Sequence, residues 1–224
     1  MSDGSAAWRP VSRPGPLRET VRETLEDMIV HGVLGAGERL REETMAERLQ
    51  VSRQPIREAL QHLAQDGFVD LRQGRGAYVH VPTRQEIDDV FQVRTVLEAQ
   101  AARLAAQRIT EPTLRELNEM YERGAAAAGG VDTRVLVDLN HSFHALIIRS
   151  AGNAVLTDVL AGLQKRIDWY FAVVAVKRAP SSWEQHEEIL KALTDRDERR
   201  AAELMTDHVS QTGSAFAERF VPMA

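Results

Sequence analysis

The sequence contains no cysteine among its 224 residues. Disulfide bonds and thiolate metal sites are therefore excluded, and any bound metal must be held by histidine, carboxylate, asparagine or water. This composition is compatible with the reducing cytoplasm, where proteins rarely depend on disulfides.

Long apolar runs are also missing. The first residues, MSDGSAAWRPVSRPGP, lack the apolar core of a signal peptide. No apolar run approaches the roughly 18 residues that a membrane span requires. We therefore expect a cytoplasmic protein with no membrane partner. The proline, glycine and serine content of residues 1–15 predicts a disordered arm.

The chain also lacks an excess of positive charge. Its formal net charge is −5, of which residues 1–81 contribute −1 and the remainder −4. Bulk charge therefore gives no indication of a nucleic-acid partner. An argument for DNA binding must rest on where individual basic residues are placed.

Residues 16–81 combine three short helical patterns with a β-hairpin. Apolar residues at helical spacing predict helices over 17–31, within REETMAERL, and from Ser52 to Asp66. The stretch FVDLRQGRGAYVHV then alternates apolar and polar residues and turns at QGRG, which predicts a hairpin. Three helices and a hairpin form the layout of a winged helix-turn-helix, whose third helix enters the major groove of DNA.

Two arginines lie at the start of the predicted third helix. Arg53 and Arg57 are four residues apart, on the face opposite the apolar residues of that helix. The planar guanidinium matches the O6 and N7 acceptors of guanine. The alternative is that these arginines only form surface ion pairs, with Glu58 or Asp66 as partners.

Three further residues of this region are placed to contact DNA. Ser52 is a good N-cap for the third helix, and its hydroxyl and the Gln54 amide could contact adenine edges or phosphates. Arg75 lies at the tip of the hairpin between two glycines, where it could contact phosphate or the minor groove.

The stretch MAERLQVSRQPIREAL resembles the signature of the GntR family of bacterial transcription regulators. The resemblance covers residues 17–81, with Ala36 in place of the usual proline. It implies that operator DNA is read by Arg53 and Arg57, with Ser52 and Gln54 beside them and Arg75 in the wing.

From Thr83 the pattern changes to long amphipathic helices. Thr83 and Glu86 form a capping-box pattern that opens the first of them. Helical stripes then follow over about 87–108, 110–124, 132–150, 154–176, 182–194 and 197–220. Residues 82–224 are therefore predicted to form an all-α antiparallel bundle of six or seven helices.

Three histidines of this region lie on the apolar faces of three different helices. His144 follows Asn140 by four residues, so both project to the same side of their helix, and His186 and His208 lie among apolar neighbours. One buried histidine is usually a hydrogen-bonded core residue. Three of them, with an asparagine oxygen, favour a site for zinc, nickel, iron or manganese.

The pieces FQVRTVLEAQAARLAA, NHSFHALIIRSAGN, SSWEQHEEILKAL and DERRAAELMTDHV resemble the FCD domain of the FadR-like branch of the GntR family. The resemblance implies that a divalent metal is bound by Asn140, His144, His186 and His208. Asparagine stands where many members have aspartate, which removes one negative charge.

The same resemblance implies an organic-acid effector beside the metal. Arg94 and Arg166 are possible partners of its carboxylate. Arg94 lies on a mostly buried helix, so its charge needs a partner, and Glu98 is an equally good one.

These patterns together predict a mainly α protein with a winged helix-turn-helix domain (16–81) and a helical effector-binding and dimerisation domain (82–224). We expect a homodimeric transcription regulator that acts as a repressor and is not an enzyme. Its expected partners are double-stranded operator DNA, a divalent metal ion, with zinc favoured, and a small carboxylate. Two alternatives stay open: a metal-dependent helical enzyme, and a DNA-binding regulator whose metal is purely structural.

Overall fold

The computed structural model describes residues 16–220, and the arm predicted at residues 1–15 lies outside them. The fold divides into two compact units. The first contains Gly37–His80 and the chain up to Asp27, and the second contains Met28–Ala36 and the chain from Val81. None of the described helices is both long and apolar enough to cross a membrane.

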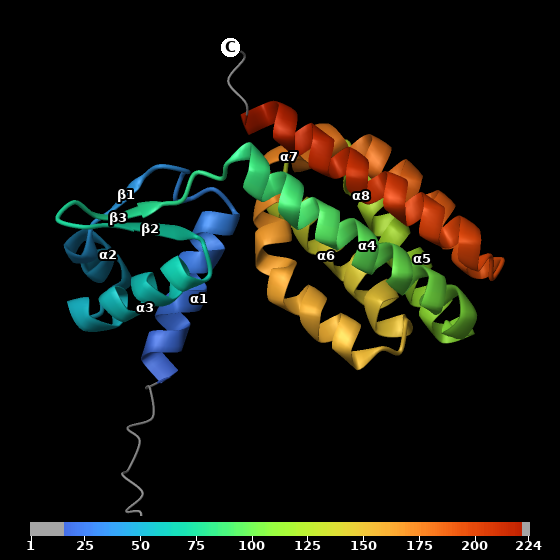
Figure 1. Cartoon of the computed structure of the whole chain (residues 1–224), viewed down its shortest axis with the longest axis horizontal. Helices are drawn as coiled ribbons and strands as arrows, with labels where there is room; N and C mark the ends of the chain where they lie inside the picture. The colour runs from blue at the N-terminus through green and yellow to red at the C-terminus, as the bar shows by residue number, and fades with distance from the viewer. Residues whose placement is uncertain (1–15, 221–224) are drawn as a thin grey trace, which may run out of the picture. The chain divides into compact units, whose positions relative to one another are not determined.

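The first unit has the predicted winged helix-turn-helix architecture (Figure 1). Its elements are α1 (Pro16–Val30), apart from the last three residues of that helix, and β1 (Arg39–Leu40), α2 (Glu42–Leu49), α3 (Arg53–Gln65), β2 (Val69–Arg72) and β3 (Gly76–Val79). The predicted hairpin is formed by β2 and β3, and the short strand β1 pairs with the other edge of β3, so the antiparallel sheet has the order β1-β3-β2. Strand β1 is too short to produce an alternation in the sequence.

The core of this unit orients α3. Ile56, Leu60 and Leu63 are buried on one face of the helix, which packs on α2 and on β2. The turn before α3 is fixed by Gln50, which adopts the left-handed conformation (φ 55°) and ends α2. The polar start of α3 is therefore held on the exposed side of a fixed scaffold.

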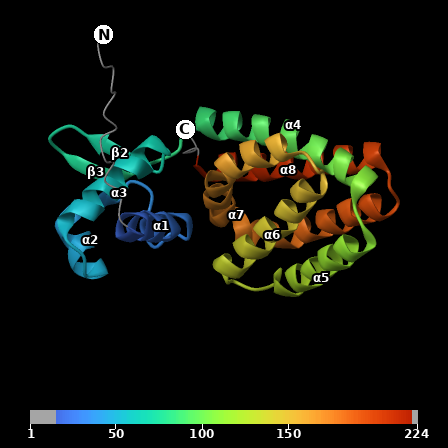
Figure 2. The same ribbon diagram turned by 90° about the horizontal axis from the view of Figure 1, so that it is seen from below.

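The second unit is an all-helical bundle (Figures 1 and 2). Its helices are α4 (Arg84–Arg108), α5 (Glu111–Ala127), α6 (Thr133–Ser150), α7 (Ala154–Thr194) and α8 (Glu198–Phe220). The predicted capping box of Thr83 and Glu86 is present at the start of α4. The most extensive packing is between α4 and α8, while α5, α6 and α7 pack on one another.

The two helices predicted over 154–176 and 182–194 are one continuous helix, α7. Pro180 lies inside it and removes one backbone hydrogen bond, and Figures 1 and 2 show α7 bending near its middle. Buried residues on both sides of the proline, among them Ala179 and Trp183, keep the helix intact through the bend. Within residues 16–220 the bundle therefore has five helices, and the predicted number of six or seven was wrong.

The packing of α5 on α7 yields a prediction about two helical glycines. A Cβ at Gly124 in α5 would overlap the indole ring of Trp183, whereas a Cβ at Gly162 in α7 would meet nothing within 4 Å. We expect Gly124→Ala to lower the free energy of unfolding by about 1–3 kcal/mol through overpacking. Gly162→Ala should raise it by up to about 1 kcal/mol, because alanine favours the helix. Urea unfolding of both variants checks this, and equal stabilities would contradict it.

Candidate metal centre and nucleic-acid interface

Three histidines from three helices meet inside the bundle. His144 comes from α6, His186 from α7 and His208 from α8, and each is at most 2% exposed. The Nε2 atoms are 3.2 Å apart between His144 and His186, 3.1 Å between His144 and His208, and 3.2 Å between His186 and His208. The predicted convergence of these three side chains is thus present.

Hydrogen bonds on the far sides of two rings determine where the protons lie. The Nδ1 of His144 donates to Oε2 of Glu98 (2.6 Å), and the Nδ1 of His208 donates to Oε1 of Gln185 (3.0 Å). With the proton on Nδ1, a neutral imidazole presents a lone pair at Nε2. At most one of the three Nε2 atoms, that of His186, can then carry a hydrogen. Lone pairs therefore face each other, an arrangement that a bound cation satisfies.

The spacing of the three nitrogens fits a first-row metal ion. Imidazole nitrogens bind zinc at about 2.0–2.1 Å, so two ligands of one ion lie roughly 2.8–3.4 Å apart for bond angles between about 90° and 109°. The observed separations of 3.1–3.2 Å fall within this range. The triad also forms a group of potential ligand atoms that all lie within 4.8 Å of one another.

Asn140 adds an oxygen to the same part of α6. It precedes His144 by one helical turn and is 3% exposed. Its Oδ1 is buried and has no hydrogen-bond partner among the described residues. An orphaned buried acceptor one helical turn from His144 is compatible with the fourth protein ligand that the sequence predicted.

The electrostatics of the cluster favour the neutral form of His186 and of His208. Burial, followed by the neighbouring charges of His144, Arg178 and Arg94, lowers the pKa of His186 well below its usual range. Burial also lowers the pKa of His208, together with the same positive neighbours and His186. Because metal binding requires unprotonated imidazole, both residues are ready to act as ligands at neutral pH.

Glu98 supplies the negative charge next to the cluster. Burial alone would raise its pKa, but the charges of Arg94 and His144 and their hydrogen bonds outweigh burial and hold the pKa at about 2. Arg94 Nε donates to Glu98 Oε1 (2.5 Å), so the sequence alternative of an internal acid as partner is realised. Arg94 is 1% exposed, and its Nη1 has no hydrogen-bond partner within residues 16–220. One N–H group of this guanidinium is therefore available to a ligand.

Arg166 occupies a different environment. It lies half-buried on α7; burial raises the pKa of Tyr170, and the charge of Arg166 partly opposes that rise. The arginine charges that act on His186 and His208 come from Arg94 and Arg178, so the described contacts do not bring Arg166 to the triad.

The sequence did not reveal that Arg178 and Gln185 lie around the triad. It indicated Glu98 as a partner of Arg94 but not of His144. The spacing by four residues of Arg178, Ser182 and His186 was a signal for Arg178. Gln185 and Glu98 reach their histidines across helix boundaries, and no spacing within one helix indicates such contacts.

The N-terminal end of α3 presents the predicted polar residues to solvent. Ser52, Arg53, Gln54 and Arg57 are all exposed. Ser52 is the N-cap residue, but its side chain makes no capping hydrogen bond and is thus available for other contacts. Gln54 donates to Glu58 (2.7 Å).

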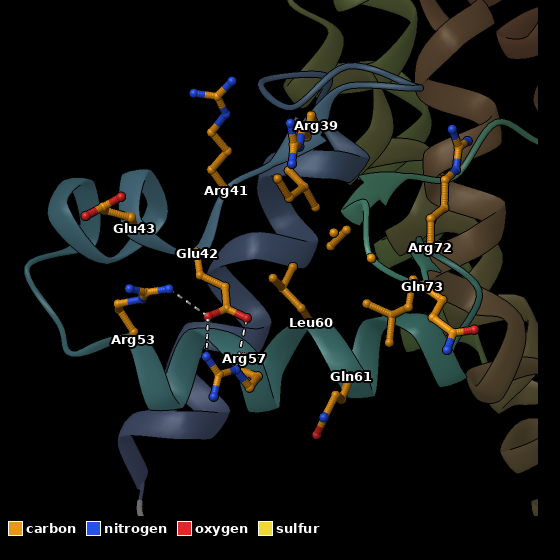
Figure 3. Close-up of a pocket in the computed structure, with 15 residues that line it drawn as sticks. Arg39, Arg41, Glu42, Glu43, Arg53, Arg57, Leu60, Gln61, Arg72 and Gln73 are labelled. Carbon is orange, nitrogen blue, oxygen red and sulfur yellow. Dashed lines mark hydrogen bonds and ion pairs between the residues drawn. The ribbon is translucent and has the colours of Figure 1, made fainter.

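Both arginines of α3 are directed at one carboxylate of α2 (Figure 3). Arg57 donates to Glu42 through Nε (3.0 Å) and Nη2 (2.8 Å), and Arg53 Nη2 lies 3.6 Å from the same side chain. The hydrogen bond from Arg57 is the main reason that the pKa of Glu42 is lowered. The partner is therefore Glu42 and not Glu58 or Asp66. The arginine side chains remain 60% and 51% exposed, and an exposed pair of this kind contributes only about 0–1 kcal/mol.

The wing completes the exposed polar surface. Arg75 lies in the turn between Gly74 and Gly76, whose φ angles of 70° and 95° are those that glycine tolerates best. The hollow between α2, α3 and the wing is also lined by Arg39, Arg41 and Arg72, which the sequence reading did not select (Figure 3). Several arginines thus surround the start of α3 although the chain as a whole is acidic.

Comparison with known proteins assigns both parts of the chain to known families. Residues 17–79 match the model of the bacterial regulatory proteins of the gntR family, and residues 89–211 match the FCD domain. The chain is 28% identical to the HTH-type transcriptional repressor RspR of Escherichia coli K12, covering 88% of this chain and 87% of the relative. It is 30% identical to the Nta operon transcriptional regulator of Aminobacter aminovorans, covering 78% and 82%.

The fold agrees with these matches. The structure of E. coli McbR/YncC superposes with a TM-score of 0.76 at 22% identity, covering 95% of this chain and 100% of the other. A helix-turn-helix model, an FCD model and two regulators of comparable length thus agree on the same assignment. The chain therefore belongs to the GntR family of bacterial regulatory proteins, carries an FCD domain, and is a DNA-binding transcriptional regulator.

Proposed function

We propose that this regulator is a homodimeric repressor whose helical domain binds a divalent metal and a small organic acid that modulates operator binding. Residues 16–81 form the DNA-binding domain, and residues 82–224 form the effector-binding and dimerisation domain. One observation carries the proposal: three Nε2 atoms converge at 3.1–3.2 Å in the same bundle interior that holds the unpaired Oδ1 of Asn140 and Nη1 of Arg94.

His144, His186, His208 and Asn140 hold the metal in this proposal. Nitrogen-rich ligand sets suit zinc, and also nickel, iron or manganese. Because all four ligands are neutral, the ion keeps its full charge and can attract a carboxylate to an open coordination position. Glu98 and Gln185 orient two of the imidazoles through their Nδ1 atoms, which is the usual role of such outer partners.

The acid binds to the metal and to Arg94. The Nη1 of Arg94 is buried without a partner in the part of the chain that the structure describes, so a carboxylate that accepts its N–H also removes the cost of leaving that donor unsatisfied. Arg166 remains a second candidate from the family resemblance alone.

In the DNA-binding domain, Arg53 and Arg57 read base edges from α3, with Ser52 and Gln54 beside them and Arg75 in the wing. Binding exchanges the exposed Glu42 pairs for guanine or phosphate contacts, which is inexpensive because surface ion pairs are weak. Two such domains in a dimer match two half-sites about one helical turn apart.

Two alternative functions can be distinguished from this proposal: a metal-dependent enzyme and a regulator whose metal is purely structural. A metal-dependent enzyme would need a general base, and the nearest acid, Glu98, is already bonded to Arg94 and His144. A purely structural metal accounts for the histidines but leaves Arg94 Nη1 without a function. The unpaired donor favours a site that also binds a ligand.

Metal retention tests the proposed centre. We expect the purified chain to hold about one metal ion per protomer, and His144→Ala to lose it, because the remaining ligands cannot complete the site. His141→Ala is the matched control. His141 lies on the same helix, three residues before His144, but its Nδ1 bonds Asp168 (3.0 Å) and not the triad. Elemental analysis gives the metal content. Unchanged metal in His144→Ala would exclude the centre.

DNA affinity tests whether Arg57 contacts base edges. The operator is first selected from a random DNA pool. Arg57→Ala should weaken binding to this operator by about 1–3 kcal/mol, because a bidentate base contact is lost. The same variant should weaken binding to random DNA much less. Arg115→Ala, an exposed arginine of α5, should bind both DNAs as the wild type does. Equal losses on operator and random DNA would assign Arg57 to a phosphate contact instead.

A further inference from the structure

Helix α7 carries a row of buried polar atoms without hydrogen-bond partners. Arg178 Nε, Ser182 Oγ and His186 Nδ1 each lack a partner among the described residues. The three residues are spaced by four, so they lie on one face of α7, and they are 6%, 0% and 0% exposed. Buried polar atoms are rarely left unsatisfied in folded proteins, and three on successive turns indicate a missing occupant.

Arg178 is the most costly member of this row. Its Nη1 donates to Ser181 Oγ (2.5 Å) and its Nη2 to Gln185 Oε1 (2.5 Å), and both partners are uncharged. Within the described residues, no carboxylate lies within ion-pair distance of its guanidinium. Burial lowers the pKa of Arg178, but a guanidinium stays protonated in proteins. A buried charge without a counter-ion requires an anion.

This guanidinium belongs to the surroundings of the histidine triad. Gln185 Oε1 accepts hydrogen bonds from both Arg178 and His208. The charges of Arg178 and Arg94 each lower the pKa of both His186 and His208, with Arg178 acting more strongly on His186 and Arg94 on His208. The two arginines come from α7 and α4, so they approach the same imidazoles from different helices.

The charges of this interior do not balance. Arg94 and Arg178 are positive and Glu98 is the negative partner among these described groups, so at least one positive charge is in excess whatever charge the histidines carry. A divalent metal raises the excess to at least three. A monocarboxylate leaves two of these charges uncompensated, whereas a dianion leaves one. The unpaired Arg94 Nη1, Arg178 Nε and Ser182 Oγ are all able to donate, so they require acceptor atoms.

We infer that Arg178 and Ser182 form a second anion-binding arm along α7, and that the effector is a dianion: an organic acid with a second carboxylate or a phosphoryl group at its other end. The inference rests on the proposed function, in which the first carboxylate binds the metal and Arg94. It adds the class of the ligand and two residues that recognise its far end.

The test compares acids of equal length on the zinc-loaded full-length chain. Succinate is paired with butyrate and glutarate with valerate, and 3-phosphonopropionate serves as the phosphoryl counterpart of succinate. Isothermal titration calorimetry gives the dissociation constants, and thermal unfolding gives an independent readout. We expect at least one dianion to bind about tenfold or more tightly than its matched monocarboxylate, because a charge-assisted pair with a buried arginine is gained. Tighter binding of the phosphonate would identify a phosphoryl group as the second anion.

Variants then locate the second arm. Arg178→Met should abolish the preference for the dianion and leave binding of the monocarboxylate within about twofold of the wild type. Ser182→Ala should weaken only the dianion, by a smaller factor. Lys177→Met is the matched control, since Lys177 is the exposed neighbour on the same helix, and it should retain the preference.

A further readout does not depend on any acid. Arg178→Met without ligand should melt at the same temperature as the wild type or higher, because it removes an uncompensated buried charge. If that variant does not fold, Arg178→Gln replaces it in the binding comparison. A wild type that binds matched mono- and dicarboxylates equally, and in the same way as Arg178→Met, overturns the second arm and leaves the acid-sensing function intact. Binding of no acid at all overturns both, while the metal content remains a separate result.

Discussion

The second unit is organised around a polar constellation that is buried in the interior of a helical bundle and must be satisfied there. Glu98 of α4 bonds His144 of α6, and Gln185 of α7 bonds His208 of α8. These contacts link helices in pairs, and the histidine triad joins the pairs. The cost of burying the polar side chains is offset only when each of them has its hydrogen-bond partner. The same contacts direct the Nε2 lone pairs inward, so the features that hold the helices in register also define the candidate metal centre.

The periodicity of the sequence was sufficient to find the residues that lie on the inner faces of their helices. Asn140, His144, His186 and His208 were selected because each lies on an apolar stripe, and the structure brings the three histidines together. The winged helix-turn-helix was predictable for the same reason, since its helices and hairpin have short, distinct repeats. These predictions depend only on local spacing.

The features that the sequence did not reveal depend on contacts between elements. The pairing of Arg57 with Glu42 joins residues fifteen positions apart on α2 and α3, and no local pattern favours it over Glu58. The gap between 176 and 182 suggested a helix end, but packing on both sides of Pro180 carries α7 through it. In both cases tertiary packing, which a single sequence does not display, decides between local alternatives.

The acidic net charge and the Glu42 pairs act in the same direction in DNA recognition. Non-specific DNA affinity depends mainly on neutralising phosphates, and a chain with a formal charge of −5 gains little from it. The arginines at the start of α3 lie next to the carboxylate of Glu42, which competes with DNA acceptors for their N–H groups. Weak binding to arbitrary DNA is therefore compatible with stronger binding to a sequence that offers bidentate acceptors.

In the proposed function, a connection between acid binding and DNA binding is suggested by where Arg94 and Glu98 lie in the chain. Both belong to α4, the helix that directly follows the winged helix-turn-helix in sequence. A ligand changes DNA affinity only if it binds two arrangements of the protein with different free energies. An acid that contacts Arg94 on α4 and Arg178 on α7 has contacts on two helices, so its affinity depends on their relative position. In the proposed function, α4 is therefore the helix through which binding of the acid in the bundle affects the DNA-binding domain.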